Sequence, residues 1–227
     1  MEHINAKRQF NVHDIYKFIA IFLMFIDHIG MYILNGNVWF RCVGRLSYPI
    51  FAFIYGEHFN KNNSNLLFNG LCLFAFDLFL KNEIRFNILV CFFISGLLVK
   101  IYNKLKVTKF LFVEILTVLH FFIYQYFEYG VFTFLFMITT LKNKKWLLVV
   151  FALYLMEEIY IFKFNGKQIL LLLTLSVCEI HCFFIYKNNK IKENKITKYI
   201  KTISRNSMEV YFIQYVLFKL LSLKLTL

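Results

Sequence analysis

Turn-forming residues are scarce in this sequence. Its 227 residues include one proline, Pro49, and eight glycines. Because proline and glycine mark most turns, little of the chain is left for long irregular connections. The phosphate-binding glycine loop, the HExxH zinc motif and the GxSxG nucleophile motif are absent as well. The sequence therefore carries none of the short signatures of P-loop NTPases, zinc peptidases or serine hydrolases.

Acidic residues are also few, 13 against 26 Lys and Arg, which gives a net charge of +13. In a soluble protein such a balance suggests nucleic acid as a partner. Here the basic residues fall mostly between apolar runs, so membrane topology and anionic membrane lipid explain them better. We expect no nucleic-acid partner.

Five cysteines occur singly, four of them within apolar runs, which is not the pattern of a disulfide framework. Cys178 and Cys182 share a helix face, with Glu179 and His181 nearby, so a metal site is one interpretation. Buried structural thiols are the other, and the one we favour. No metal is expected.

Apolar residues dominate the remainder. The chain is 59% hydrophobic and 20% aromatic, with 30 Phe, against about 45–50% apolar residues in soluble domains. Long apolar segments recur over the whole length, as in polytopic helical membrane proteins. We predict an all-α, polytopic transmembrane helical bundle of about nine helices (eight to ten), forming a single integral membrane domain over 1–227. The predicted helices are 14–34, 46–59, 66–80, 86–101, 109–126, 130–141, 146–162, 168–186 and 207–225.

The distribution of basic residues between these helices predicts an orientation. With nine spans, one side of the membrane collects 18 of the 26 basic residues and the other side eight. The bias places the N-terminus in the cytoplasm and the C-terminus outside. The polar start, MEHINAKRQFNVHD, is followed by no small-residue cleavage site, so we expect the first helix to be retained.

Segment 187–205 is basic and carries Ile at positions 191, 196, 200 and 203. This spacing is roughly helical, so the segment could lie flat on the inner leaflet as an interfacial helix. A solvated cytoplasmic loop is the alternative.

The first apolar helix contains two adjacent ionisable residues, Asp27 and His28. Such groups are costly in hydrocarbon and mark functional sites by default. Adjacent residues point about 100° apart on a helix, so each must find its partner on another helix. Asp27 could pair with Arg41 or Arg45, which share one face if their turn is helical. His28 could act as a neutral general base if a carboxylate orients its far nitrogen. A structural ion pair and a core histidine are the alternatives.

Residues 14–59 resemble the TraX family of bacterial inner-membrane proteins, which is linked to N-terminal acetylation of pilin. The matching residues are Asp14, Lys17, Ala20, Met24, Asp27, His28, Gly30, Arg41, Gly44, Arg45, Pro49, Phe51, Ala52, Phe53 and Glu57. Fainter similarity follows at Asn87, at Glu128-Tyr129-Gly130 and at SMEVYFIQ near the C-terminus. Two positions depart from the family, which usually has Asp where Glu128 stands and often has His where Gln214 stands.

The resemblance implies a membrane acyltransferase that takes acetyl from cytoplasmic acetyl-CoA and acetylates a pilin or fimbrial subunit. Asp27 and His28 would be catalytic; Arg41, Arg45, Glu57, Glu128 and Tyr129 would position substrate or charge. Direct transfer is favoured over a covalent acyl-enzyme. Two alternatives remain: acetylation of a cell-surface glycan or lipid-linked sugar, and a non-enzymatic transporter or fimbrial assembly factor.

Overall fold

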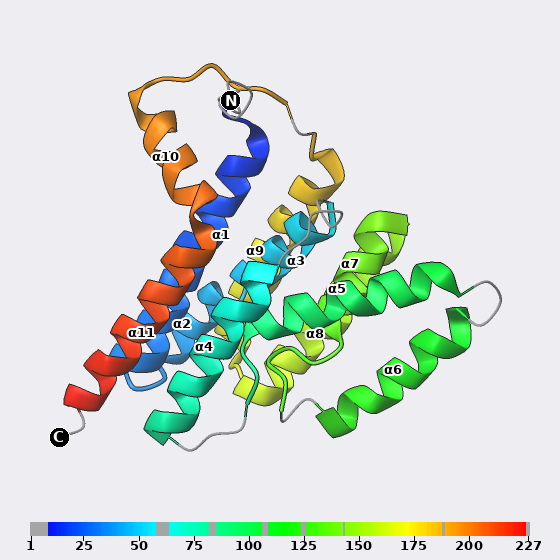
Figure 1. Ribbon diagram of the computed structural model, residues 1–227, viewed down its shortest axis with the longest axis horizontal. Coiled ribbons are helices and arrows are strands. Elements are labelled where there is room, and N and C mark those ends of the chain that lie inside the picture. Colours follow the sequence, from blue (N-terminus) through cyan, green and yellow to red (C-terminus); the bar gives the residue numbers. More distant parts are fainter. Residues whose placement is uncertain are drawn as a thin grey trace. The chain divides into compact units, whose positions relative to one another are not determined.

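The computed structural model describes residues 9–57, 64–81, 85–105, 109–123, 126–142, 144–187 and 189–225. These residues are largely helical, and no strand is formed among them (Figure 1). The predicted all-α class is therefore confirmed. The chain divides into two compact units. Unit 1 comprises Met1–Ile50 and Gly166–Leu227, and unit 2 comprises Phe51–Asn165.

Unit 1 is built around the first helix. It contains α1 (Val12–His28), the π-helix η1 (Ile29–Ile33), α2 (Val38–Gly44), the start of α3 (Ser47–Glu57), α9 (Gly166–Ile185), α10 (Lys195–Arg205) and α11 (Ser207–Leu225). A capping box begins α1: the Asn11 side chain accepts from the Asp14 amide, and the Asp14 carboxylate accepts from the Asn11 amide. α1 packs against α2, α10 and α11, and α2 packs against α9.

Unit 2 contains the rest of α3, α4 (Ser64–Lys81), α5 (Ile88–Lys104), α6 (Lys109–Ile123), α7 (Phe132–Lys142), the 3-10 helix η2 (Lys144–Trp146) and α8 (Leu147–Phe162). α5 packs against α4 and α7, and α7 packs against α8. Asn87 caps α5 by accepting from the Leu89 amide at 3.1 Å, and it donates to the Gly70 carbonyl at 2.7 Å. A buried cluster that includes Phe134 and Met137 forms a core of this unit.

Each of the nine predicted helical segments is helical over most of its length. Three differences concern the regions that matter most for the site. The first predicted helix changes to π geometry after His28, and the polar break that follows it contains a further helix, α2. In segment 187–205, an irregular stretch leads into the helix α10; whether the segment lies on the membrane surface or in the cytoplasm stays a prediction.

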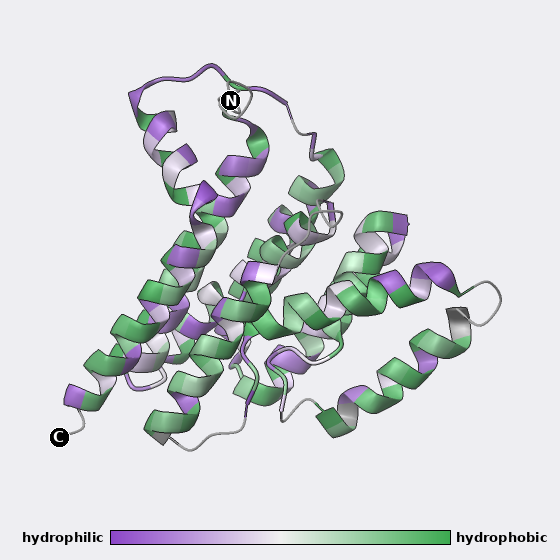
Figure 2. Cartoon of the chain, in the orientation of Figure 1, coloured by the Kyte–Doolittle hydropathy of each residue, from purple (hydrophilic) through white to green (hydrophobic). Residues whose placement is uncertain are grey.

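Apolar surface and helix length identify a membrane protein. Val12–Ile33 and Gly166–Ile185 are long and apolar enough to cross a membrane, and Ser64–Leu80, Leu111–His120 and Phe132–Lys142 are shorter apolar helices. Large apolar side chains face outward, such as Phe122 on α6 at 67% exposed and Met156 on α8 at 66%. Figure 2 shows hydrophobic residues along most of the helical ribbon. Many exposed apolar side chains on the helices fit a lipid environment. The multi-pass topology and its orientation stay predictions.

Candidate functional site in unit 1

Asp27 and His28 point to different helices, as their adjacency predicts. The Asp27 carboxylate faces α2, where it accepts from the Arg41 guanidinium at 2.6 Å and lies 3.7 Å from Nε of Arg45. The first distance is a charge-assisted hydrogen bond, and the second is an ion-pair contact. All three side chains are buried. One carboxylate thus serves two arginines, and the cluster carries a net positive charge.

Close helix packing makes this cluster possible. A Cβ atom built on Gly44 would lie 2.4 Å from Cβ of Asp27, so only glycine lets α2 come this near to α1. Arg41 lies in the last turn of α2 and Arg45 is its C-cap residue. The turn between the two arginines is therefore helical, and both approach Asp27 from one side. A cation near a helix C-terminus is also favoured by the helix dipole.

His28 faces α11 instead. Its Nδ1 lies 3.2 Å from the amide nitrogen of Gln214, and both side chains are buried. Four aromatic rings surround the imidazole at centroid distances of 5.7–6.1 Å: those of Tyr32, Tyr211, Tyr215 and Phe218. At Nδ1 the partner of His28 is therefore a neutral amide within an aromatic surround, and the role of His28 as a general base stays a prediction.

A π-helical turn follows His28 directly. The Leu34 amide donates to the Ile29 carbonyl at 3.0 Å, across five residues. The chain then turns tightly, because the amides of Gly36 and Asn37 both donate to the Gly30 carbonyl, at 2.8 and 2.9 Å. A Cβ on Gly30 would lie 2.5 Å from Cβ of Phe40, so glycine is required here too. π turns occur frequently at functional sites, and this one returns the chain so that α2 lies beside Asp27.

Three aromatic partners of His28 lie on one face of α11, and the sequence analysis did not use them as site residues. Tyr211, Tyr215 and Phe218 occur with Gln214 at spacings of three and four residues, which is one face of a helix. That spacing could have indicated a face directed at His28. Lys219, also on α11, is 2% exposed and donates to the Tyr215 hydroxyl at 3.3 Å.

The other predicted site residues, Glu57, Glu128 and Tyr129, belong to unit 2. Glu57 pairs with Lys144 at 2.8 Å. Glu128 accepts from the Ile88 amide at 3.1 Å, at the start of α5, where a carboxylate complements the helix dipole. Tyr129 has a left-handed backbone with φ of 63°. Each has a local structural role, and their predicted role in positioning substrate stays a prediction.

A histidine and a carboxylate also meet in unit 2. Nε2 of His120 lies 2.8 Å from the Glu157 carboxylate, and its Nδ1 accepts from the Val131 amide at 3.2 Å. The imidazole is then held with its proton on Nε2. Among the described residues, no group of three or more His, Cys, Asp or Glu side chains is arranged to hold a metal ion.

Sequence similarity relates this chain to other proteins. An uncharacterized protein of Rickettsia prowazekii (strain Madrid E) is 26% identical, over 94% of this chain and 93% of its own. No solved structure matches. The model of the TraX family, described as TraX protein, matches residues 12–201, from the start of α1 into α10. That range covers most of the chain, includes Asp27, His28, Arg41 and Arg45, and shows that this protein belongs to the TraX family.

Proposed function

We propose that this protein is a bacterial inner-membrane acyltransferase that acetylates the N-terminal amine of a pilin or fimbrial subunit, with acetyl-CoA as donor. Membership of the TraX family points to a pilus-related function. One observation carries the catalytic part of the proposal. His28 is buried and hydrogen-bonded to the Gln214 amide, and the next residue in the chain, Asp27, belongs to a buried cluster with two arginines. Buried ionisable groups in an apolar helix are expensive and point to function.

The reaction needs one base and one site for negative charge. The amine nitrogen attacks the thioester carbonyl carbon, so that a C–N bond forms and the C–S bond breaks. His28 takes the proton that the amine loses and returns a proton to the departing sulfur, giving an amide and the CoA thiol. The guanidinium groups of Arg41 and Arg45, held beside Asp27, would stabilise the oxyanion of the tetrahedral intermediate.

Gln214 sets the proton position on His28 in this proposal. When its amide N–H donates to Nδ1, the neutral imidazole carries its proton on Nε2. When the amide is turned by 180°, its oxygen accepts from Nδ1–H and leaves Nε2 as the base. A glutamine can thus hold either tautomer, whereas a carboxylate would hold only the second. The base step uses the second form.

Orientation supports the same reaction. With the N-terminus in the cytoplasm, Asp27 lies about 20 Å along the first helix, at ~1.5 Å per residue, in the outer half of the membrane. A donor from the cytoplasm and an acceptor outside would meet near this depth. The basic cytoplasmic side complements the phosphates of CoA.

Purified protein in nanodiscs, supplied with radiolabelled acetyl-CoA and a pilin with a free N-terminus, tests the proposal. We expect label on the pilin N-terminus, and its loss in His28→Gln. His181→Gln is the matched control, since His181 is exposed on α9 of the same unit. This variant should transfer the acetyl group at the unmodified protein's rate. Transfer that survives His28→Gln would refute the mechanism. Label on a lipid-linked glycan in place of pilin would support acetyl transfer but would show that the acceptor is a glycan.

A further inference from the structure

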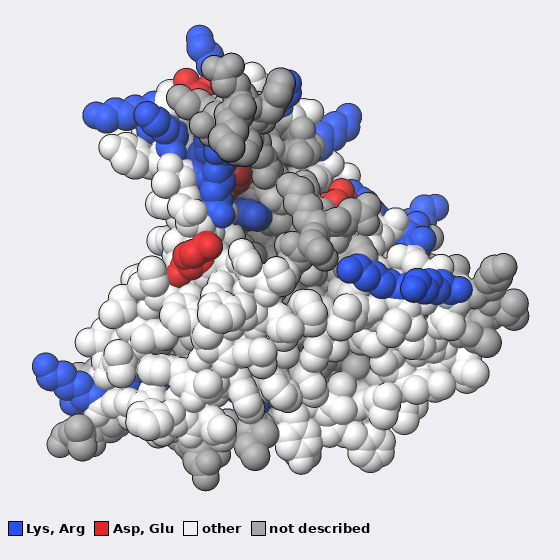
Figure 3. Space-filling model, viewed as in Figure 1, with Lys and Arg blue, Asp and Glu red and all other residues white. Residues whose placement is uncertain are grey.

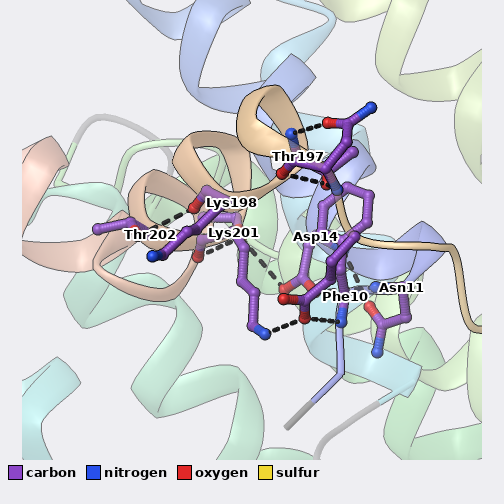
Figure 4. A network of polar contacts seen from close by, with 10 residues as sticks. Phe10, Asn11, Asp14, Thr197, Lys198, Lys201 and Thr202 are labelled. Atoms are coloured by element: carbon purple, nitrogen blue, oxygen red, sulfur yellow. Dashed lines mark hydrogen bonds and ion pairs between the residues drawn. The ribbon is translucent and has the colours of Figure 1, made fainter. Parts of the chain in front are cut away.

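Polar contacts join both the irregular stretch before α10 and α10 itself to the start of α1. The Phe10 amide donates to the Glu193 carboxylate at 3.0 Å, and Glu193 also pairs with Lys201. The Ser204 hydroxyl donates to the Asp14 carboxylate at 3.1 Å. Figure 4 shows this network of polar contacts between the first residues of α1 and the α10 region. These contacts hold α10 against the start of α1, so one face of α10 is buried by α1.

A second face of α10 is apolar and exposed. Ile196, Tyr199 and Ile203 are 69%, 65% and 37% exposed. At 100° per residue they fall within one arc of about 60°. Lys201 and Ser204, which contact Glu193 and Asp14, are buried and lie outside that arc. The exposed apolar stripe is thus distinct from the face that holds the helix in position.

The third face of α10 is basic. Lys195, Lys198 and Arg205 are exposed. At 100° per residue, Lys195 lies beside the apolar stripe, about 40° from Tyr199, and Lys198 and Arg205 lie further round the helix, about 130–150° from the centre of the stripe. Figure 3 shows Lys and Arg side chains gathered over this part of unit 1. Across 187–205 there are seven basic residues and one acidic residue, Glu193. A helix with an apolar stripe on one side and cations beside and opposite it suits an interface that has hydrocarbon on one side and anionic headgroups on the other.

The location of α10 matches such a surface. Asn206 alone separates it from α11, and α11 packs against α1, which is long and apolar enough to cross a membrane. The Ser204–Asp14 contact places α10 at the first turn of that helix. For a helix that crosses a membrane, the first turn lies near the polar boundary of the bilayer.

We propose that α10 is an interfacial helix that binds anionic phospholipid. Ile196, Tyr199 and Ile203 enter the boundary between headgroups and acyl chains, while Lys195 and Lys198 contact lipid phosphates. The lipid then fixes the position of α10, and through Asp14 and Glu193 it fixes the start of α1. The inference is independent of the acetyl transfer proposed above.

Depth in the bilayer is the first test. Full-length Trp39→Phe/Trp146→Phe protein with Tyr199→Trp carries one tryptophan, on the apolar stripe. In vesicles of phosphatidylcholine and phosphatidylglycerol, lipids brominated high on the acyl chain should quench this tryptophan. In the matched control, Lys198→Trp replaces Tyr199→Trp and places the tryptophan on the basic face, where quenching should be several-fold weaker. Equal quenching at the two positions, or none at either, would overturn the proposal.

Lipid charge is the second test, on protein without tryptophan changes. Phosphatidylglycerol should raise the thermal midpoint above its value in phosphatidylcholine. Lys195→Gln/Lys198→Gln should lower the relative affinity for the anionic lipid by roughly fivefold per lysine, on the order of the usual contribution of a juxtamembrane lysine. Lys163→Gln/Lys167→Gln removes two exposed lysines elsewhere and should change little. Equal lipid preference in both double variants would refute the lipid site, as would stabilisation by CoA with no effect of phosphatidylglycerol.

Discussion

The Asp27 cluster allows a quantitative prediction about a buried ion pair. Asp27→Asn leaves two guanidinium groups buried without their carboxylate, and removing one partner of a buried pair costs about 3–5 kcal/mol. The cost should be divided unequally between the two arginines. Coulomb attraction depends on 1/r, so it falls by only about 30% from the Arg41 distance of 2.6 Å to the Arg45 distance of 3.7 Å. The shorter contact adds a charge-assisted hydrogen bond, worth about 1.5–3 kcal/mol.

A pair of double-mutant cycles separates these contributions. Asp27→Asn is combined with Arg41→Gln in one cycle and with Arg45→Gln in the other. The Asp27–Arg41 coupling should exceed the Asp27–Arg45 coupling by about 1–2 kcal/mol, because only the first contact includes the hydrogen bond. The assay is denaturant unfolding in mixed micelles, followed by far-UV circular dichroism.

Glu57 and Lys144 supply the matched control cycle. Their contact is also short, 2.8 Å, but their side chains are 27% and 36% exposed. An ion pair this accessible should couple by less than about 1 kcal/mol. Equal couplings for the two arginines, or a coupling of Asp27 to Arg41 as small as that of the control, would refute the reasoning that burial and the hydrogen bond hold the cluster together.

Two further predictions concern backbone approach and pH. Gly44→Ala should destabilise the fold by about 1–3 kcal/mol in the same unfolding assay, as overpacking does, because its Cβ would meet Asp27. Gly166→Ala, with no atom within 4 Å of the added Cβ, should be tolerated, and equal losses in both variants would contradict the packing argument. Hydrogen bonds from Lys201 and from the Phe10 amide hold the pKa of Glu193 below its ordinary value of 4.5. A lowered folded pKa means that this contact stabilises the fold above the unfolded pKa and is lost as pH falls through the folded pKa. The protection factor of the Phe10 amide in hydrogen exchange should therefore drop in acid, and a drop of the same size in Glu193→Gln would disprove the assignment.

Much of the fold could be predicted because its signals are local. Nine apolar segments, separated by short polar breaks, give the helices, since period and length are read directly along the chain. The direction of Asp27 and His28 was predictable for the same reason: neighbouring residues diverge by about 100° on any helix. That geometry required separate partners, and Arg41 was a correct choice for Asp27 because its charge restricts the options.

The partner of His28 was harder to predict, because an imidazole can form a hydrogen bond with a carboxylate, an amide or a hydroxyl. Gln214 lies 186 residues further along the chain. The spacing of the aromatic residues around it marks one face of α11, but the sequence does not show which helix that face contacts. The π turn after His28 was also missed. Its apolar sequence fits an α-helix, and the close approach of Gly30 to Phe40 that accompanies it is a tertiary contact.

The sequence by itself determined an all-α membrane protein of the TraX family and the ionisable residues that need explanation. Composition, periodicity and family similarity are properties of the chain, so no contact map is needed to read them. Only the tertiary structure decided which groups meet: Asp27 with two arginines, His28 with Gln214 and four rings, and α10 with the start of α1. Such pairings depend on how closely helices approach. For α1 and α2, the close approach requires that position 44 has no side chain, because a Cβ atom there would meet Asp27. The sequence shows the glycine but does not show which helix packs against it.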